Sequence, residues 1–208
     1  MPRTADHEQR RRQIAAAVCE LISEQGLDAV TVARTAAAAG ISVGLVQHYF
    51  RTKDEMLLHA FDHVSASIRA RVDRRIQAGI EHRRPIAGVL AEALAEFLPL
   101  DAVRRTEFRV TKAFAGRALD APALAEVDAA TARAVRADLA RAVHNGKECG
   151  EVELDADPEP AAVRLLAVTE GLALQIHRDP ATEELARSVL DIELAATFTG
   201  QCRQYKNP

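Results

Sequence analysis

The sequence predicts an all-α protein of about nine helices, for three reasons. Alanine is abundant and aromatic side chains make up only 4% of the 208 residues, a composition that favours helices packed through small and aliphatic side chains. Apolar side chains recur at helical spacing in successive segments, whereas no segment shows the alternation of a strand. Apolar residues reach 48%, which is enough to bury a core without disulfides in a chain of this length.

The first three helices are expected to form a small N-terminal unit. Residues 7–25 carry an apolar stripe at helical spacing, and Gly26 can end that helix. Thr31 can cap a second helix of about two turns, which Gly40 can stop in a left-handed conformation. Ser42 is a good cap for the third helix. A turn of a few residues that contains glycine is typical of a helix-turn-helix.

A long fourth helix is expected to join this unit to the rest of the chain. Thr52 and Glu55 match the reciprocal capping box at its start, and Phe50 just before it is expected in the core. Asn145 and Gly146 are expected to end the seventh helix and to open a loop. The remaining helices are predicted over residues 85–98, 101–119, 123–144, 160–177 and 182–199.

The charge of the chain is unevenly distributed. Its net value of −3 argues at first against a nucleic-acid partner, because such partners are held largely by Lys and Arg on phosphates. Residues 1–53, however, carry seven Lys and Arg against five Asp and Glu, whereas the other 155 residues carry 20 against 25. Any contact with DNA is therefore expected in the first quarter of the chain.

Several protein classes lack support in the sequence. Cys19, Cys149 and Cys202 form no CxxC pair, so neither a disulfide framework, nor a metal site, nor a cofactor is expected, although Cys149 in the predicted loop could sense oxidants. His59 and His63 lie four residues apart without a third ligand, which favours two solvated histidines over a metal. The chain has no GxSxG, HExxH or P-loop motif, which argues against a helical enzyme. No stretch approaches the roughly 20 apolar residues that span a bilayer, so a cytoplasmic protein without a membrane partner is expected.

Residues 30–57, VTVARTAAAAGISVGLVQHYFRTKDEML, resemble the DNA-binding region of the TetR family of transcriptional regulators. The segments LPLD at 98–101 and EGLALQ at 170–175 are similar to the betaine-regulator-like branch of that family. The features shared over residues 30–57 are a capped second helix, small residues up to a glycine, an apolar residue followed by serine, and then His48, Tyr49, Phe50 and Lys53.

The resemblance implies a DNA-binding helix-turn-helix domain in residues 1–53 and a helical domain for ligand sensing and dimerisation in residues 54–208. It also implies a sequence-specific regulator that binds double-stranded DNA as a homodimer, at a pseudo-palindromic operator. The expected mode of action is repression that ends when a small-molecule effector binds the second domain. Control by a protein partner, or activation of transcription, remain alternatives.

The third helix, which is the recognition helix of a helix-turn-helix, is expected to enter the major groove with its N-terminal residues, Val43, Gly44 and Leu45. Val43 and Leu45 can contact thymine methyl groups, and Gln47 can pair bidentately with adenine, unless it is only a solvated polar residue. Gly44 either lets the backbone approach the sugar-phosphate wall or merely avoids a packing clash.

Other residues of this region are expected to hold phosphates. The resemblance implies that His48 and Tyr49 donate hydrogen bonds to phosphate and that Lys53 supplies a cation, contacts that position the protein without specifying a sequence. Lys53 could also be an ordinary surface lysine. Thr31 can donate to a phosphate as well as cap its helix. The arm that carries Arg3 and Arg10 to Arg12 can reach the DNA backbone or minor groove, or can be a disordered basic end.

The C-terminal domain carries two further sets of candidates. Small and apolar residues on the last two helices suggest a dimer interface, although this stripe could pack only within its own chain. The interface candidates are Ala167, Gly171, Leu185, Val189, Ile192 and Ala196. The middle helices are expected to enclose the effector, and the candidates there, each of which could equally be simple core, are Phe97, Phe108, Thr111, Phe114, Leu172 and Gln175.

Overall fold

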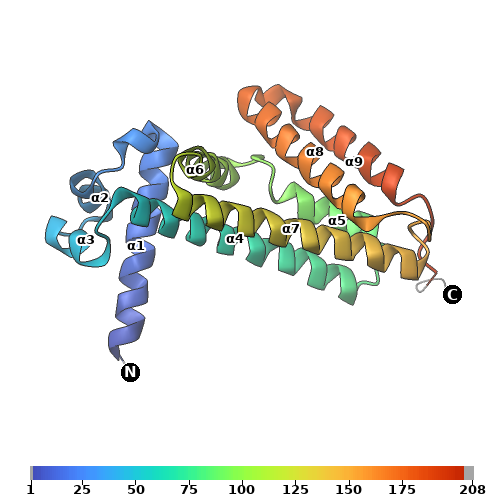
Figure 1. Ribbon diagram of the computed structural model, residues 1–208, viewed down its shortest axis with the longest axis horizontal. Helices are drawn as coiled ribbons and strands as arrows, with labels where there is room; N and C mark the ends of the chain where they lie inside the picture. The colour runs from blue at the N-terminus through green and yellow to red at the C-terminus, as the bar shows by residue number, and fades with distance from the viewer. Residues whose placement is uncertain (1, 204–208) are drawn as a thin grey trace. The chain divides into compact units, whose positions relative to one another are not determined.

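The computed structural model describes the backbone of residues 2–203 and the side chains from residue 7 onward, so Arg3 lies outside the described side chains. Within this range the chain forms nine α-helices and no strand, which confirms the all-α class (Figure 1). The helices are α1 (Pro2–Gln25), α2 (Val32–Ala39), α3 (Val43–Tyr49), α4 (Lys53–Glu81), α5 (Ile86–Ala95), α6 (Ala102–Ala118), α7 (Pro122–Cys149), α8 (Pro158–Arg178) and α9 (Glu183–Thr197), with short 3-10 turns at Leu27–Ala29 and Pro180–Thr182.

The chain divides into two compact units. Unit 1 consists of Met1–Ser67 and Arg105–Asp128, and unit 2 of Ile68–Arg104 and Ala129–Pro208. Unit 1 therefore contains the first three helices, the first half of α4, all but the start of α6 and the beginning of α7. The predicted division into residues 1–53 and 54–208 separates DNA binding from ligand sensing and dimerisation, and it stays a prediction. None of the described helices has a stretch long and apolar enough to cross a membrane.

The core of unit 1 fixes α3 and the start of α4 against α1. Ile14 and Val18 of α1 are fully buried, as is Val46 of α3. Phe50, which follows α3, is buried as predicted; its ring centroid lies 5.3 Å from that of His59, and the Arg11 guanidinium lies 5.5 Å from it. These contacts leave α3 anchored by one face and by its C-terminal end.

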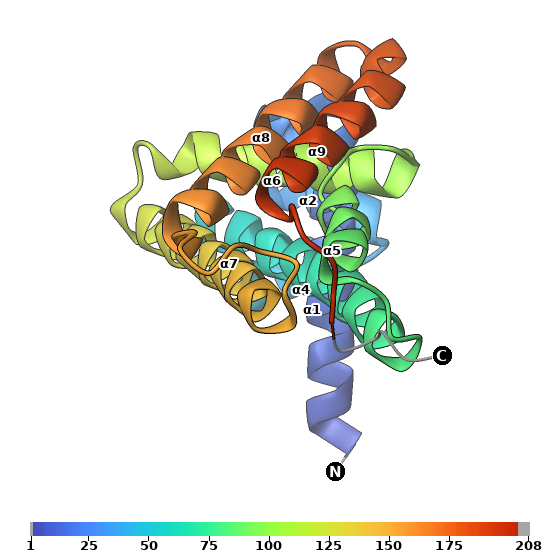
Figure 2. The same cartoon turned by 90° about the vertical axis from the view of Figure 1, so that its right-hand side faces the viewer.

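In unit 2, α8 and α9 lie side by side, as two perpendicular views show (Figures 1 and 2). The guanidinium of Arg164 on α8 joins them by donating to Thr197 Oγ1 at 2.7 Å and by lying 3.3 Å from the Glu193 carboxylate. Each helix has one buried apolar face, represented by Leu165 on α8 and Leu190 on α9. The pair is therefore held together from within its own chain.

A buried carboxylate ties α4 to the end of α5. Glu96 accepts hydrogen bonds from Arg71 Nε and Arg75 Nε, each at 2.9 Å. Burial by itself would raise the pKa of Glu96, but the hydrogen bonds from Arg75 and Arg71 and the charge of Arg104 outweigh it, and the pKa lies below its ordinary value. The cluster therefore stabilises the fold at neutral pH, and this contribution is lost as the pH falls through the lowered pKa.

The predicted end of the seventh helix was wrong. We expected Asn145 and Gly146 to end it, but α7 continues to Cys149 and stops at Gly150, whose φ of 91° is left-handed. Gly146 is helical for a packing reason: a Cβ atom there would lie 2.6 Å from Val152 Cγ2 and 2.9 Å from Phe198 Cε1. Gly146 therefore permits a close approach of α7 to its neighbours instead of ending the helix.

Gly146→Ala is accordingly expected to destabilise the protein by about 1–3 kcal/mol, because the added methyl group overpacks a filled space. Gly116→Ala is the matched control, since Gly116 is also helical but a Cβ there meets no atom within 4 Å. This control is expected to stabilise the protein by up to about 1 kcal/mol through helix propensity. Urea denaturation measures both; equal effects of the two substitutions would contradict the packing explanation.

Candidate nucleic-acid interface

The caps predicted for α2 and α3 are confirmed. Thr31 Oγ1 accepts a hydrogen bond from Arg34 N at 3.3 Å, and Ser42 Oγ accepts one from Leu45 N at 3.2 Å. Gly40 between them has φ of 65° and ψ of 33°, the left-handed conformation that ends α2. These residues set the sharp turn between the two helices and so fix the direction in which α3 begins.

The start of α4 is capped almost as predicted. Thr52 Oγ1 accepts from Glu55 N at 3.1 Å, while the Glu55 carboxylate accepts from Arg51 N at 2.7 Å, one residue before the cap. In addition, Arg117 of α6 donates two hydrogen bonds to the Asp54 carboxylate, each at 2.9 Å, and these hold the pKa of Asp54 below its ordinary value. The start of α4 is therefore fixed both by its own cap and by the ion pair with α6.

One face of α3 points away from the rest of unit 1. Val43 is 44% exposed, Gln47 is exposed, and Leu45 is half-buried, whereas Val46 is fully buried. A Cβ atom at Gly44 would meet no other atom of the chain within 4 Å. The structure therefore gives no support to the idea that Gly44 avoids a clash within the protein.

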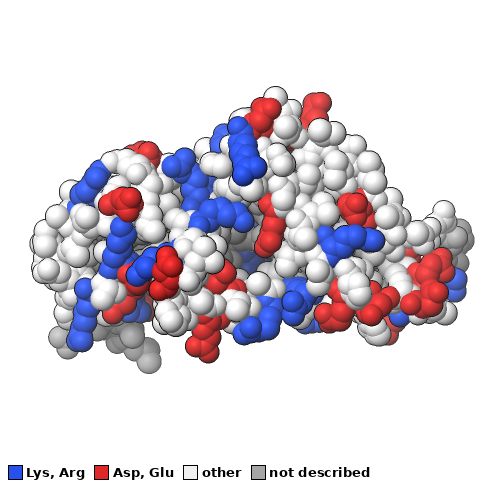
Figure 3. Space-filling model, turned by 45° about the horizontal axis from the view of Figure 1, so that its top comes forward, with Lys and Arg blue, Asp and Glu red and all other residues white. Residues whose placement is uncertain are grey.

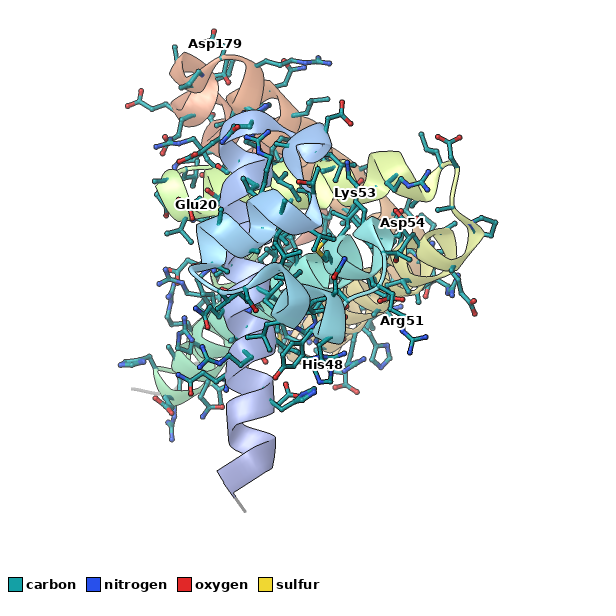
Figure 4. All side chains as sticks on the ribbon, turned by 90° about the vertical axis from the view of Figure 1, so that its left-hand side faces the viewer. Glu20, His48, Arg51, Lys53, Asp54 and Asp179 are labelled. Atoms are coloured by element: carbon teal, nitrogen blue, oxygen red, sulfur yellow. The ribbon has the colours of Figure 1, made fainter. Side chains whose placement is uncertain are left out.

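The candidate phosphate contacts surround α3. His48 is exposed and projects outward (Figure 4), while Tyr49 is half-buried, with its ring centroid 4.6 Å from that of His7 and 5.3 Å from that of His48. Lys53 Nζ lies 3.9 Å from Asp28 Oδ1, a surface ion pair of the kind that contributes little. Thr31 uses its oxygen as an acceptor in the cap, so its hydroxyl hydrogen is available to an anion.

Two exposed cations were not among the predicted contacts. Arg51 lies between α3 and α4 and projects from the same side of the unit as His48 (Figure 4). Arg34 is exposed on α2, and its guanidinium hydrogen-bonds Gln25 Oε1. The sequence offered no pattern to separate them from ordinary surface arginines; their placement beside the helix-turn-helix is the only signal. Acidic and basic side chains are interspersed over the face shown in Figure 3.

The candidate effector residues divide between the two units. Phe108, Thr111 and Phe114 lie on α6 in unit 1, where the Phe114 ring stacks on Phe61 at 3.9 Å between centroids. In unit 2, Leu172 is half-buried and Gln175 is exposed on α8, and Phe97 is half-buried just after α5. A cavity of about 730 Å³ in unit 2 is lined by none of them, but by side chains that include Arg71, Arg74, Arg75, Glu92 and Glu96.

The candidate dimer residues lie largely on the outside of α8 and α9. Leu185 is 65% exposed and Ile192 is 62% exposed, and Val163, on the same side of α8 as Ala167 and Gly171, is 49% exposed. Ala167, Gly171 and Ala196 are exposed and Val189 is half-buried. The alternative that this stripe packs within its own chain is therefore wrong for all of these residues except, in part, Val189.

Two other sequence-based ideas are altered by the structure. His63 is exposed, while burial and the charge of Arg11 lower the pKa of the half-buried His59. Cys149 is not in a loop: it is the last residue of α7 and is buried. Burial, with the neighbouring Glu151 and Cys202, raises the pKa of its thiol to about 12, which is opposite to what an oxidant-sensing cysteine needs.

Two family models match this chain. Residues 14–60 match the bacterial regulatory proteins of the tetR family, and residues 87–199 match the C-terminal domain of the BetI-type transcriptional repressors. The HTH-type transcriptional regulator PksA of Bacillus subtilis is 31% identical over 180 residues, which cover 86% of this chain and 84% of PksA. The regulator BetI of Escherichia coli is 36% identical over 78 residues, 38% of this chain and 40% of BetI.

Solved structures show the same architecture. A transcriptional regulator from Rhodococcus sp. Rha1 has a TM-score of 0.78 and 32% identity, covering 91% of this chain and 96% of its own. A protein from Saccharomonospora viridis, solved in complex with choline, has a TM-score of 0.75 and 20% identity, covering 91% and 95%. Taken with the capped helix-turn-helix of α2 and α3, these matches identify the chain as a member of the TetR family, a DNA-binding transcriptional regulator with a BetI-type C-terminal domain.

Proposed function

We propose that the protein is a ligand-responsive repressor that binds a pseudo-palindromic operator as a homodimer and leaves it when a small molecule binds the C-terminal domain. The observation that carries this proposal is the outward face of α3, where Val43 and Gln47 are exposed and the backbone at Gly44 is open. Side chains at this position can reach base edges in the major groove. We place the protein in the cytoplasm, where bacterial DNA lies.

The homodimer is supported by the apolar face of α8 and α9. Leu185 and Ile192 lie seven residues apart on α9 and are both more than 60% exposed, beside the small residues Ala167 and Gly171 of α8. A face of this kind, on helices whose opposite faces are already buried, is suited to a second copy of the same helices in a two-fold arrangement. Two recognition helices related by that axis would contact half-sites about one turn, or a multiple of it, apart.

The effector is proposed to be a small molecule held among the middle helices. Support comes from relatives: the Saccharomonospora protein was solved with choline, and the multidrug binding protein EbrR, 28% identical with a TM-score of 0.61, was solved with imidazole. In unit 2 the candidates Phe97 and Leu172 are apolar and half-buried, and Gln175 is exposed and offers a hydrogen-bonding group. A coupling free energy of about 1–3 kcal/mol between the two sites would change operator affinity about 5- to 150-fold.

Gel-shift titration of the purified protein against the DNA that flanks its own gene tests this function. The expected result is retention of one fragment at moderate salt in the presence of excess unrelated DNA, and release when the effector is added. Choline and a panel of metabolites would first be screened by thermal shift, because a ligand at 100 times its dissociation constant adds about 2.7 kcal/mol of stability. Equal retention of all fragments would contradict sequence-specific binding.

Gln47 and Lys53 are expected to differ in what they contribute to binding. Gln47→Ala should weaken binding to the operator by about 1–3 kcal/mol and relax the preference at one base pair. Lys53→Ala should weaken binding to all sequences alike and reduce the slope of log K against log salt by about one. Titrations at several salt concentrations, on operators changed one base pair at a time, measure both. Identical behaviour of the two variants would contradict the assigned roles.

A further inference from the structure

A buried group of two thiols and a carboxylate lies in unit 2, where α7 ends. Cys149, Glu151 and Cys202 are all buried, and their ligand atoms lie within 4.8 Å of one another. Cys149 Sγ and Glu151 Oε1 are 3.3 Å apart. Cys202 is 53 residues after Cys149 in the sequence, so the group is formed by the fold and follows no spacing motif.

The backbone around this group holds the three residues in position. Gly150, in its left-handed conformation, turns the chain at the end of α7. The segment after α9, which runs down beside α5 in Figure 2, is fastened to this turn because Arg203 N donates to Cys149 O at 2.7 Å and Gly200 N donates to Glu151 O at 2.9 Å. The two residues that make these hydrogen bonds lie on either side of Cys202 in the sequence, so the bonds hold Cys202 close to Cys149.

The carboxylate of Glu151 is already oriented. Ile86 N donates to Oε1 at 2.8 Å, and Ala87 N donates to Oε2 at 3.0 Å, so the first turn of α5 holds both oxygens. Backbone amides at a helix N-terminus stabilise a negative charge, which explains how a carboxylate is tolerated in a buried place. Hydrogen bonds of this kind also fix the orientation of ligating carboxylates in metal sites.

From this arrangement we propose that Cys149, Cys202 and Glu151 form a binding site for a thiophilic divalent cation, with Zn²⁺ as the reference ion. Tetrahedral zinc has Zn–S distances of about 2.3 Å and Zn–O distances of about 2.0–2.2 Å, which place ligand atoms about 3.5–3.8 Å apart. The observed separations need only small side-chain rotations to meet these values. A water molecule would supply the fourth ligand.

Binding of the cation releases two protons from the protein. The two thiols release their protons to solvent as both sulfurs bond to the cation, and the Cys149 S–H that now donates to Glu151 is replaced by the metal. Two thiolates, one carboxylate and one divalent cation leave a net charge of −1 beside the α5 N-terminus. The bound cation would clamp the end of α7, the start of α5 and the segment after α9 to one another.

The test is metal binding by the full chain kept reduced with a phosphine. Alkylation under denaturing conditions of a sample purified without reductant first counts the free thiols, and three are expected; a Cys149–Cys202 disulfide in that sample would overturn the proposal. Equilibrium dialysis should then find one Zn²⁺ per chain, and Co²⁺ should give a sulfur-to-cobalt charge-transfer band. Because two protons leave, the apparent affinity for Zn²⁺ should rise about 100-fold per pH unit below the thiol pKa values.

Matched variants assign the ligands. Cys202→Ser and Glu151→Gln should each lower the affinity for Zn²⁺ at least tenfold, and Cys202→Ser should abolish or weaken the charge-transfer band. Cys19→Ser, which changes the buried cysteine of α1, should leave both unchanged. Circular dichroism and thermal melting confirm that the variants fold. Wild-type protein that binds no Zn²⁺, or Cys202→Ser that binds it as tightly as wild type, would overturn the proposal and leave operator binding by α3 unaffected.

Discussion

Replacement of Gly44 by leucine is expected to lower the affinity for the operator at least 100-fold while leaving the free protein at least as stable as the wild type. A Cβ at this position meets no atom of the chain, so the leucine is accommodated, and loss of a helical glycine adds up to about 1 kcal/mol of stability. On DNA the same side chain would project from the first turn of α3 and separate the helix from the groove. Fluorescence anisotropy with labelled operator and a thermal melt measure the two properties.

Gly116→Leu is the control for this substitution, because Gly116 is also an exposed helical glycine with open space around it, but on α6. Its affinity for the operator is expected to stay within about twofold of wild type. Gly44→Ala should fall between the two leucine variants. If Gly44→Leu bound the operator within about threefold of wild type, α3 would not approach DNA through its first turn.

The double substitution Leu185→Arg and Ile192→Arg is expected to produce a folded monomer that has lost high-affinity operator binding. Both side chains are largely exposed in the single chain, so their replacement removes little packing within it. In a dimer they would lie in the buried centre, from which charged residues are depleted because their desolvation is costly. A monomer contacts one half-site only, and the operator affinity should fall at least 100-fold.

Analytical ultracentrifugation at micromolar concentration measures the mass of this variant, and circular dichroism its helix content. Leu119→Arg is the control, because Leu119 is 86% exposed in the turn between α6 and α7, outside the proposed interface. It should remain a dimer with unchanged operator affinity. A double variant that still sediments as a dimer would contradict the proposed interface and show that the dimer forms through another surface.

The helix-turn-helix could be predicted from sequence because its determinants are local. Thr31, Gly40 and Ser42 act within three or four residues of themselves, through a side-chain cap or a left-handed φ, and the structure shows each in its predicted role. Phe50 is buried, as expected. The ends of longer helices were predicted less well where tertiary packing decides them.

Gly146 illustrates that limit. Glycine after asparagine is a common helix stop, yet here the glycine is retained inside α7 because Val152 and Phe198 leave no room for a Cβ atom. The helix ends instead at Gly150. No local pattern shows which of these two glycines ends the helix. The answer depends on Val152, which follows the turn, and on Phe198, which is distant in the sequence.

The same reason explains why the cluster of Cys149, Glu151 and Cys202 could not be predicted. A metal-binding motif is recognised by close spacing of its ligands, whereas this group depends on the segment after α9 returning to the end of α7. Residues that contact an effector are similarly non-local. Burial alone, as at Phe108 and Phe114, does not separate a pocket wall from a core.

Selection of binding sites from a random DNA library tests whether this chain reads DNA as a two-fold dimer through α3. The purified protein would be taken through several rounds of selection at moderate salt, and the bound sequences determined. We expect one enriched motif of two inverted half-sites, with centres about one helical turn, 34 Å, or a multiple of it apart. The absence of any enriched motif, or a single half-site without an inverted copy, would contradict this expectation.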